Sequence, residues 1–402
     1  KKMGSNYAKM KRSAVSVRAL RKHNLFLMLF CGLICGILFP VTGQTVGKIY
    51  IGEWPLISTL CVAFMFFLTG LRIHLEEIKR AMKAWKLVIY SNINILIFTP
   101  VLGFIPLELP FLAKEFRIGL ALMCCMPTTL ATGIAIVSNS NGNTILALMI
   151  TVTSNLLGIF TAPFALSILL STTEGVFISP LPLLLKLLMT ILLPMVAGKL
   201  LQQASSSFHP LAFINKFACA YGFQLKILSN FLLVMIPWIK ISQASTSLKN
   251  TAVTQLLFCL SAAAVLHILI LVINFAVLVG GRANVHSPRE FRSVLFMASQ
   301  KTMLLAMSMI SFLPEQGIGQ FGLVIIPCII LHSLQLFMDA PLASYLGRGD
   351  SALHIDQEGD VESPKQHVVP HDISSIKRSP SECTLIAQQE DSVGKKAQAP
   401  PQ

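Results

Sequence analysis

Residues 123–143 read MCCMPTTLATGIAIVSNSNGN, an apolar stretch with a polar interruption near its centre. Pro127 and the threonines and glycine that follow it break a run that is otherwise apolar enough to cross a membrane. A bilayer offers no water to pair with free backbone groups, so a broken helix is tolerated there only where protein or an internal cavity surrounds the break. The stretch therefore predicts a membrane helix whose break faces the inside of the protein.

The composition of the whole chain indicates a multi-pass membrane protein. Hydrophobic residues make up 54% of the 402 residues, charged residues make up only 12%, and the mean hydropathy is +0.69. These values lie outside the range of soluble domains. We therefore predict an all-α protein in a lipid bilayer, with about ten helices that match a hydrocarbon thickness of about 30 Å. The predicted spans are 24–43, 54–71, 84–104, 117–137, 144–170, 180–201, 223–241, 255–280, 291–313 and 320–346.

The basic excess of the chain indicates membrane topology and not binding to nucleic acid. Residues 1–349 hold 27 Lys and Arg against nine acidic residues. With the N-terminus on the cytoplasmic or stromal side, most of these cations fall on that side of the membrane, as the positive-inside rule requires. Ten spans then place both termini on the same side.

The sequence divides into three parts. Residues 1–23 form a basic segment, residues 24–346 form the membrane body, and residues 350–402 form a polar tail that lacks the apolar content for a core and is predicted to be disordered. Ser379 and Ser381 in this tail lie beside basic residues and prolines, which makes the tail a candidate site for kinases or regulatory partners.

The membrane body shows a faint two-fold repetition between residues 24–170 and 180–346. Five spans in each half is an odd number, so the two halves must run in opposite directions, and inverted repeats with broken helices are typical of secondary transporters. Chance matches in Leu-rich helices are the alternative explanation. The matching pairs are ILFPVTGQ (37–44) with ILLPMVAGK (191–199), and CCMPTTLATG (124–133) with FMASQKTM (296–303).

Lys301 is the most informative single residue of the second half. It lies about ten residues from either end of its predicted span, too deep for its side chain to reach the membrane surface easily. A lysine at the centre of a membrane helix costs at least about 2.5–3.5 kcal/mol, so such residues are functional candidates. Its neighbours Ser299, Gln300 and Thr302 are polar. The alternative is a structural ion pair or a contact with a backbone carbonyl.

The fourth and fifth predicted spans carry a dense set of hydroxyl and amide side chains. Hydroxyls and freed carbonyls at a helix break can coordinate a cation or a solute, whereas the alternative is packing of helices through small polar residues. The set comprises Thr128, Thr129, Thr132, Asn143, Thr144, Thr151, Thr153, Ser154 and Asn155.

Two further polar residues lie in apolar spans. His267 stands alone in its span and is predicted to be a core histidine. Asp339 lies near the cytoplasmic end of the last span, where it could pair with a lysine, cap a helix or relay a proton. The chain has no GxSxG, HExxH or Walker A motif, so no enzyme is predicted. The nine cysteines form no CxxC pair, and no metal centre is predicted.

Three stretches of the chain together resemble the bile acid:sodium symporter family. They are CCMPTTLATGIA (124–135), GNTILALMITVTSNLLGIFTAPF (142–164) and SQKTM (299–303). The resemblance covers roughly 24–346 and points to the divergent branch that contains plant plastid sodium/metabolite cotransporter-like proteins, more distantly member 7 of solute carrier family 10, and fungal relatives linked to calcium homeostasis. It implies two inverted five-helix repeats arranged as a panel domain and a core domain, with helices four and nine broken and crossing.

The resemblance also implies roles for individual residues. Pro127 matches the proline that opens the break in helix four, and Thr132 and Gly133 take the place of a Ser-Asn pair that binds sodium in sodium-driven members. Thr151 matches a sodium-site threonine, and Gln300 matches a glutamine of helix nine. The implied ion and substrate site comprises Thr128, Thr129, Thr132, Gly133, Asn143, Thr151, Ser299, Gln300 and Lys301, with Pro127 at the break.

One position departs from the family pattern. Phe296 stands where sodium-driven members have a sodium-binding glutamate, so the sodium site is degenerate. We hypothesise that the ammonium group of Lys301 takes over part of the role of a bound sodium ion and attracts an anion.

The sequence therefore predicts a secondary transporter that moves a small organic anion by alternating access, with sodium as a candidate coupling ion and no other cofactor. The alternative is a non-transporting or weakly transporting regulator of calcium homeostasis that acts through cytoplasmic partners. The resemblance favours the plastid envelope over the plasma membrane. The substrate, the coupling ion and the oligomeric state do not follow from the sequence.

Overall fold

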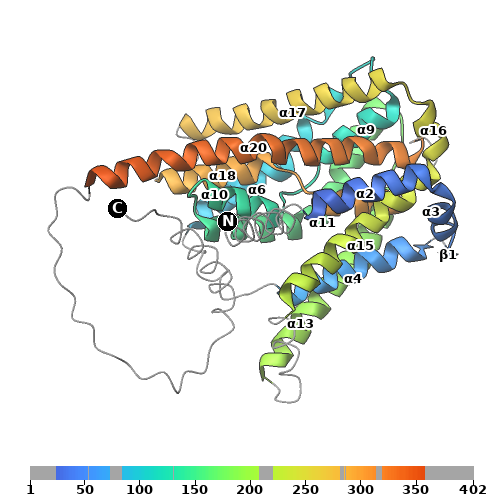
Figure 1. The fold of residues 1–402 in the computed structure, drawn as a ribbon, viewed down its shortest axis with the longest axis horizontal. Coiled ribbons are helices and arrows are strands. Elements are labelled where there is room, and N and C mark those ends of the chain that lie inside the picture. The colour runs from blue at the N-terminus through green and yellow to red at the C-terminus, as the bar shows by residue number, and fades with distance from the viewer. Residues whose placement is uncertain are drawn as a thin grey trace, which may run out of the picture.

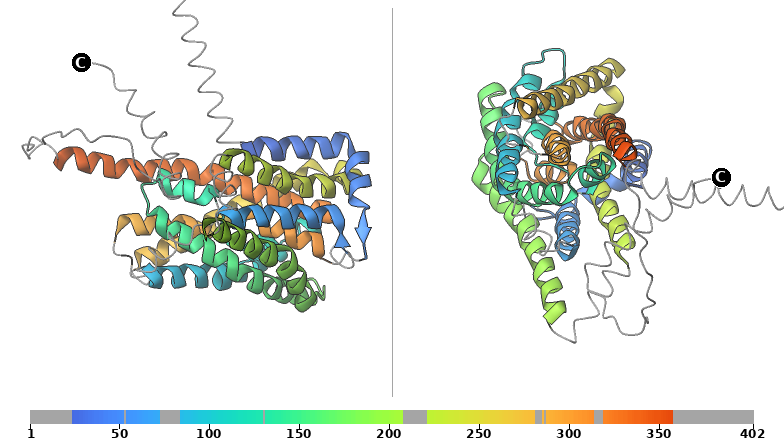
Figure 2. Two further views of the ribbon diagram at one scale, coloured as in Figure 1. Left: turned by 90° about the horizontal axis from the view of Figure 1, so that it is seen from below. Right: turned by 90° about the vertical axis from the view of Figure 1, so that its left-hand side faces the viewer.

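The structure is a computed structural model that describes residues 24–52, 54–72, 84–129, 131–207, 221–280, 285, 287–313 and 319–357. Apart from one short hairpin, the ordered elements of these residues are helices, and most of the long ones run in roughly one direction (Figures 1 and 2). The predicted basic segment 1–23 and residues 358–402 of the predicted tail lie outside the described residues.

The first half of the chain contains thirteen of these elements, one of them a π-helix (η2). They are α2 (Asn24–Leu38), α3 (Pro40–Gly47), β1 (Tyr50–Ile51), β2 (Trp54–Pro55), α4 (Leu56–Arg72), α6 (Trp85–Ile93), η2 (Asn94–Phe98), α7 (Thr99–Val101), α8 (Phe104–Leu107), α9 (Lys114–Cys124), α10 (Ala131–Asn139), α11 (Thr144–Thr173) and α12 (Pro180–Leu187). The strands β1 and β2 pair antiparallel, with Tyr50 opposite Pro55.

The second half begins with another π-helix and ends with the longest helix of the described chain. Its elements are η3 (Leu188–Leu192), α13 (Leu193–Ser207), α15 (Gly222–Gln243), α16 (Ser245–Asn250), α17 (Val253–Val279), α18 (Pro288–Ser299), α19 (Met303–Phe312) and α20 (Phe321–Gln357). In Figure 1, α17 and α20 lie next to each other along the upper side, and α4, α13 and α15 lie below them.

The chain is a multi-pass membrane protein. Within the described ranges, seven helical segments are long and apolar enough to cross a membrane, and the bent pair α2 and α3 makes an eighth. Two predicted spans fail this test for simple reasons: α4 is short, and α9 and α10 are separated by a break. A total of ten, and an inverted relation between the halves, stay predictions.

The outer helices expose large apolar side chains. Val265 on α17 is 66% exposed and Phe30 on α2 is 63% exposed. Soluble proteins rarely expose contiguous apolar surfaces of this kind, because each one leaves hydrocarbon in water. In a bilayer the same side chains face the acyl chains of the lipids.

The structure corrects the first predicted span. Instead of one helix over 24–43, α2 ends at Leu38 and α3 begins at Pro40, and the two helices are bent by 95°. Pro40 has no backbone N–H to continue α2, but its fixed φ angle suits the first position of a new helix.

The predicted tail also begins later than expected. The helix α20 continues to Gln357, so residues 350–357 are helical where the sequence predicted disorder. The helix passes through Gly347 and Gly349, and no proline interrupts it between 342 and 357.

We use the name panel group for α2, α3, α4, α13 and α15, and core group for α6 to α11 and α17 to α20, after the two domains that the resemblance implies. The two groups are in contact, because α15 packs on α19 and α20. Glycines allow close approach within the panel group. A Cβ atom at Gly70 on α4 would lie 2.0 Å from the carbonyl oxygen of Met195, and one at Gly198 on α13 would lie 2.2 Å from that of Phe67. Small residues at such contacts are the usual means by which membrane helices pack closely.

Candidate functional site

Two spans of the core group are broken in mid-course. The helix α9 ends at Cys124 and α10 begins at Ala131. The last turn of α9 tightens, with the N–H of Met126 donating to the carbonyl of Met123 at 3.1 Å, and Pro127 then has no N–H with which to continue the helix. The second break separates α18 from α19 and comprises Gln300, Lys301 and Thr302. It contains no proline.

The two breaks touch each other through their main chains. The N–H of Thr302 donates to the carbonyl of Pro127 at 2.8 Å. The hydroxyl of Thr302 also caps α19, because its oxygen accepts from the N–H of Leu304 at 3.3 Å. The crossing of the two spans is therefore held by a direct backbone hydrogen bond.

Three consecutive carbonyls of the first break are paired by groups from elsewhere in the chain. A helix that ends inside a membrane leaves its last carbonyls free, and each unpaired group is costly there. The donors are Lys301 Nζ to Met126 (3.0 Å), the N–H of Thr302 to Pro127 (2.8 Å) and Asn155 Nδ2 to Thr128 (2.9 Å). The hydroxyl of Thr151 lies 3.4 Å from the carbonyl of Thr129, but its single hydrogen is donated to the carbonyl of Ala147 at 2.8 Å.

The ammonium group of Lys301 lies between two carbonyl oxygens. Its Nζ atom donates to Ile95 and to Met126, each at 3.0 Å, and the residue is 1% exposed. In the π-helix η2 the N–H of Thr99 donates to the carbonyl of Asn94, five residues earlier. With the same spacing the carbonyl of Ile95 would accept from the N–H of residue 100. Residue 100 is a proline and has no N–H, so this carbonyl is free for Lys301. Within the described residues, no carboxylate lies within 4.0 Å of this ammonium.

The helix α20 supports the backbone of the second break. The N–H of Lys301 donates to Gln335 Oε1 at 2.9 Å, and Gln335 Nε2 donates to the carbonyl of Lys301 at 2.7 Å. The Nδ1 atom of His332 lies 3.2 Å from the same carbonyl. A single residue of α20 thus pairs both main-chain groups of Lys301.

A chain of buried polar side chains leads away from the crossing. Thr129 Oγ1 donates to Gln300 Oε1 at 2.7 Å, and Gln300 Nε2 donates to Asp339 Oδ2 at 2.9 Å. The other carboxylate oxygen, Asp339 Oδ1, lies 2.9 Å from Nε2 of His267 on α17. Each of these four residues is at most 1% exposed.

This chain gives both residues a partner. His267 is buried as predicted for a core histidine, and its partner is Asp339 on another helix. Of the partners predicted for Asp339, a lysine is replaced by this histidine. Sequence analysis missed the pair because its members are 72 residues apart. The available signal was that His267 and Asp339 each stand at an otherwise apolar position of a membrane helix.

The other predicted site residues fall into two sets, those beside the crossing and one, Asn143, away from it. Ser299 accepts from Asn274 Nδ2 at 3.1 Å beside the second break. Thr132 and Gly133 lie in the first turn of α10, and a Cβ atom at Gly133 would lie 3.1 Å from Gln300 Oε1. Asn143 is different.

Asn143 caps a helix away from the crossing. Its side chain accepts from the N–H of Leu146 at 3.1 Å, and its carbonyl accepts from Ser293 Oγ at 2.9 Å. It precedes Thr151 by eight residues, about 12 Å along a helix. The structure therefore does not bring Asn143 to the crossing, and its placement gives it the role of a helix cap.

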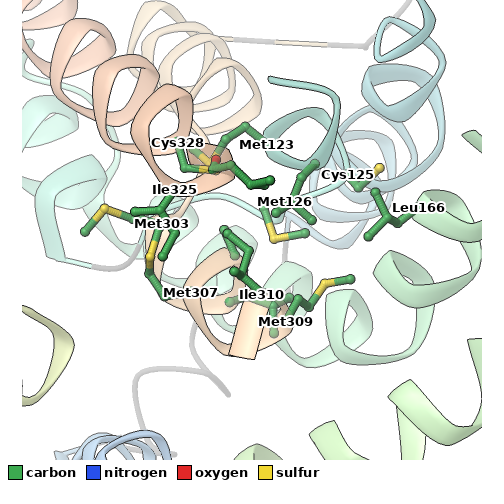
Figure 3. Packing of buried hydrophobic residues seen from close by; sticks show 14 of the residues in the cluster. Met123, Cys125, Met126, Leu166, Met303, Met307, Met309, Ile310, Ile325 and Cys328 are labelled. Atoms are coloured by element: carbon green, nitrogen blue, oxygen red, sulfur yellow. The ribbon is translucent and has the colours of Figure 1, made fainter. Parts of the chain in front are cut away.

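The apolar surroundings of the crossing are rich in sulfur. Figure 3 shows Met123 of α9, Met126 of the first break, and Met303 and Met307 of α19 in one cluster with Cys328 of α20. Methionine side chains are flexible and fit irregular spaces. Within the described ranges, no group of three or more His, Cys, Asp or Glu residues that could hold a metal ion is present.

Comparison with known proteins identifies the family of the chain. Residues 23–348 match the model of the SBF-like CPA transporter family (DUF4137). The chain belongs to this family. Membership makes it a transporter and not an enzyme.

Individual relatives agree with this assignment. The chain is 30% identical over 344 residues to "Probable sodium/metabolite cotransporter BASS4, chloroplastic" of Oryza sativa subsp. indica, covering 84% of this chain and 78% of the relative. It is 24% identical over 332 residues to "Putative symporter YfeH" of Escherichia coli, covering 81% and 92%. It is 21% identical over 293 residues to "Sodium/bile acid cotransporter 7" of Rattus norvegicus, covering 71% and 82%. The resemblance to the bile acid:sodium symporter family is confirmed.

Proposed function

We propose that the protein is a secondary transporter that carries a small organic anion across its membrane by alternating access. The observation that carries the proposal is the buried ammonium of Lys301 at the crossing of two broken spans. A buried charge is costly unless an opposite charge offsets it. The hydrogen-bond partners of this ammonium in the described chain are carbonyls, and the carboxylate of Asp339 is paired with His267. An anion that binds beside Lys301 would offset its charge.

The same geometry supports a degenerate sodium site. An ammonium group between two freed carbonyls occupies a position of the kind that suits a bound cation. Phe296 is fully buried in the place of the family's glutamate, so no carboxylate from that position can offset an additional cation. If sodium still binds as the names of the relatives suggest, Thr132, Thr151 and Gln300 are its proposed ligands, with Gly133 leaving room beside them.

Alternating access is supported by the division into the panel and core groups. If spans six to ten repeat spans one to five, a contact between spans one and seven implies a matching contact between spans six and two. The helix α2 of span one packs on α15 of span seven, and α13 of span six packs on α4 of span two. The helix α20 packs on α9, and α11 packs on α18, which is another such pair of contacts. Two related halves can exchange conformations, and this opens the site to each side in turn.

An uptake screen tests the proposed function. Full-length protein in proteoliposomes is offered labelled small organic anions under an imposed sodium or proton gradient. We expect at least one anion to accumulate, and we expect Lys301→Ala to abolish its accumulation. Lys199→Ala, in a half-buried lysine of α13 in the panel group, is the matched control and should retain uptake. Unchanged uptake and ion dependence in Lys301→Ala would remove the role given to this lysine.

The membrane of residence is proposed on similarity. The rice relative is named as chloroplastic, which favours a plastid envelope over the plasma membrane. Fluorescence of the tagged full-length protein in its own cells, compared with an envelope marker, tests this assignment.

A further inference from the structure

The pair formed by His267 and Asp339 is a buried acid and base that the proposed anion site does not use. Among the described residues, Asp339 is the buried acidic residue. The side chain of Glu174, which is 8% exposed, is paired with Lys114 and Arg117. Asp339, in contrast, has an imidazole and an amide as partners. We infer that the His267–Asp339 pair binds the proton that drives the anion across the membrane. The inference rests on the proposed function and names its coupling ion.

The charge of this pair depends on a single proton. With one proton the pair is neutral, whether the proton lies on the imidazole of an ion pair or on the carboxyl group beside a neutral imidazole. Without that proton the pair carries one negative charge. In a region of low dielectric constant, an uncompensated charge costs several kcal/mol. The protonation state of the pair therefore follows the other charges in the core group.

The ammonium of Lys301 is the charge that links the pair to the anion. In the empty transporter, Lys301 is offset when the pair releases its proton and becomes negative. When an anion binds beside Lys301, the anion offsets the ammonium, and the pair must take up a proton to become neutral. Both states have no net charge in the core group. By linkage, the anion raises the proton affinity of the pair, and the proton raises the affinity for the anion to the same extent.

A continuous set of contacts joins the two charges. Gln300 precedes Lys301 in the second break and donates to Asp339 at 2.9 Å. Gln335, one turn before Asp339 on α20, pairs with both backbone groups of Lys301. A movement of the second break during transport therefore acts on the carboxylate and on the ammonium together.

Other charged groups near α20 are few or already engaged. His332 contacts the carbonyl of Lys301, and Arg292 on α18 donates to the carbonyl of Ser140 at 2.9 Å. The backbone of Lys240 on α15 lies beside Gly322, near the start of α20. The helices α10 and α19 carry no charged residue, and the charged residues of α9 are Lys114, Glu115 and Arg117, all in its first turn.

The first test needs no substrate. Infrared difference spectra of the full-length protein in liposomes are recorded through a pH titration. We expect a titrating signal from the Asp339 carboxyl group or the His267 ring that is lost in Asp339→Asn and shifted in His267→Gln. Glu108→Gln, which removes an exposed carboxylate, should leave it unchanged. If Asp339→Asn does not fold, His267→Gln alone decides the result. Identical titrations in the wild type and the folded variant would overturn the inference.

The second test measures coupling with taurocholate, an anionic bile acid, and with any anion found in the uptake screen. A gradient of one pH unit should accumulate a monovalent anion about tenfold in the wild type. A potential clamped with potassium and valinomycin should not change this ratio, since the transported states carry no net charge. Asp339→Asn should lose accumulation and retain exchange of labelled for unlabelled anion.

The outcomes of the second test separate the two proposals. Accumulation that follows a sodium gradient and ignores pH overturns the proton inference and leaves the proposed function intact. A titrating Asp339 signal, with no anion moved under any gradient, overturns the proposed function and not the proton site.

Discussion

Both broken spans of the core group interrupt the hydrogen bonds of a membrane helix, but the first break presents acceptors and the second supplies donors. The first break presents a row of carbonyl oxygens, from Met126 to Thr128, and groups from other segments donate to each of them. The second break supplies donors, which are Nζ of Lys301 and the N–H of Thr302. The two sets are complementary, so each break satisfies part of the other. A break in a membrane helix is stable here because its partner is broken at the same level.

The largest effect is expected at the backbone hydrogen bond between the breaks. Thr302→Pro leaves the buried carbonyl of Pro127 unpaired, at about 1–3 kcal/mol, and also loses the hydroxyl cap of α19, at about 1 kcal/mol. The free energy of unfolding should therefore fall by about 2–4 kcal/mol. The φ angle of Thr302 is −83°, which proline can adopt. Thr302→Ala keeps the N–H and loses only the cap, at about 1 kcal/mol. Equal thermal stabilities of the two variants would show that the bond between the breaks does not hold the crossing.

A somewhat smaller effect is expected where α9 approaches α20. A Cβ atom at Gly119 would lie 2.3 Å from the carbonyl oxygen of Val324, so Gly119→Ala forces the two backbones apart. Overpacking of this kind costs about 1–3 kcal/mol. Gly222→Ala is the matched control, because nothing lies within 4 Å of its added Cβ atom. A melting temperature of Gly119→Ala that equals the control would contradict the close packing of α9 against α20.

The smallest effect separates two neighbouring threonines of the first break. Thr129→Val loses the hydrogen bond to Gln300 and should cost about 1 kcal/mol of stability. The hydroxyl of Thr128 is buried and has no hydrogen-bond partner in the described chain, so Thr128→Val should cost nothing. A buried unpaired hydroxyl at the crossing is available to a transported solute, and we expect Thr128→Val to weaken anion uptake without loss of stability. Thermal unfolding and uptake are measured on both variants. Thr129→Val should lower the melting temperature, whereas Thr128→Val should lower uptake at an unchanged melting temperature.

The sequence predicted the features that are local along the chain. Pro127 interrupts an apolar run, and FMASQKTM places four polar residues in mid-span, so both breaks follow from their own segments. Asn143 was assigned to the binding site, although an asparagine directly before an apolar helix is also typical of a helix cap. Its neighbours in the polar stretch SNSNGN favoured the cap as well.

The remaining features depend on contacts between distant segments. The partners of Lys301 are carbonyls 206 and 175 residues away, and one of them is free only because a π-helix precedes Pro100. The register of a π-helix is set by packing and has no simple signal in the sequence. The His267–Asp339 pair likewise requires α17 and α20 to be placed side by side. A single sequence gives no measure of such proximity.

The most direct test of the account measures the thermal stability of the purified wild type in sodium chloride and in choline chloride, without any substrate. The ammonium of Lys301 already occupies the position between the carbonyls of Ile95 and Met126. A ligand that binds only the folded state raises its stability, and the increase grows with the ratio of ligand concentration to Kd. We predict no sodium-dependent shift of the melting temperature in the wild type, and a shift in Lys301→Ala, where the two carbonyls are vacated. A melting temperature of the wild type that rises with sodium concentration and not with choline would contradict this prediction.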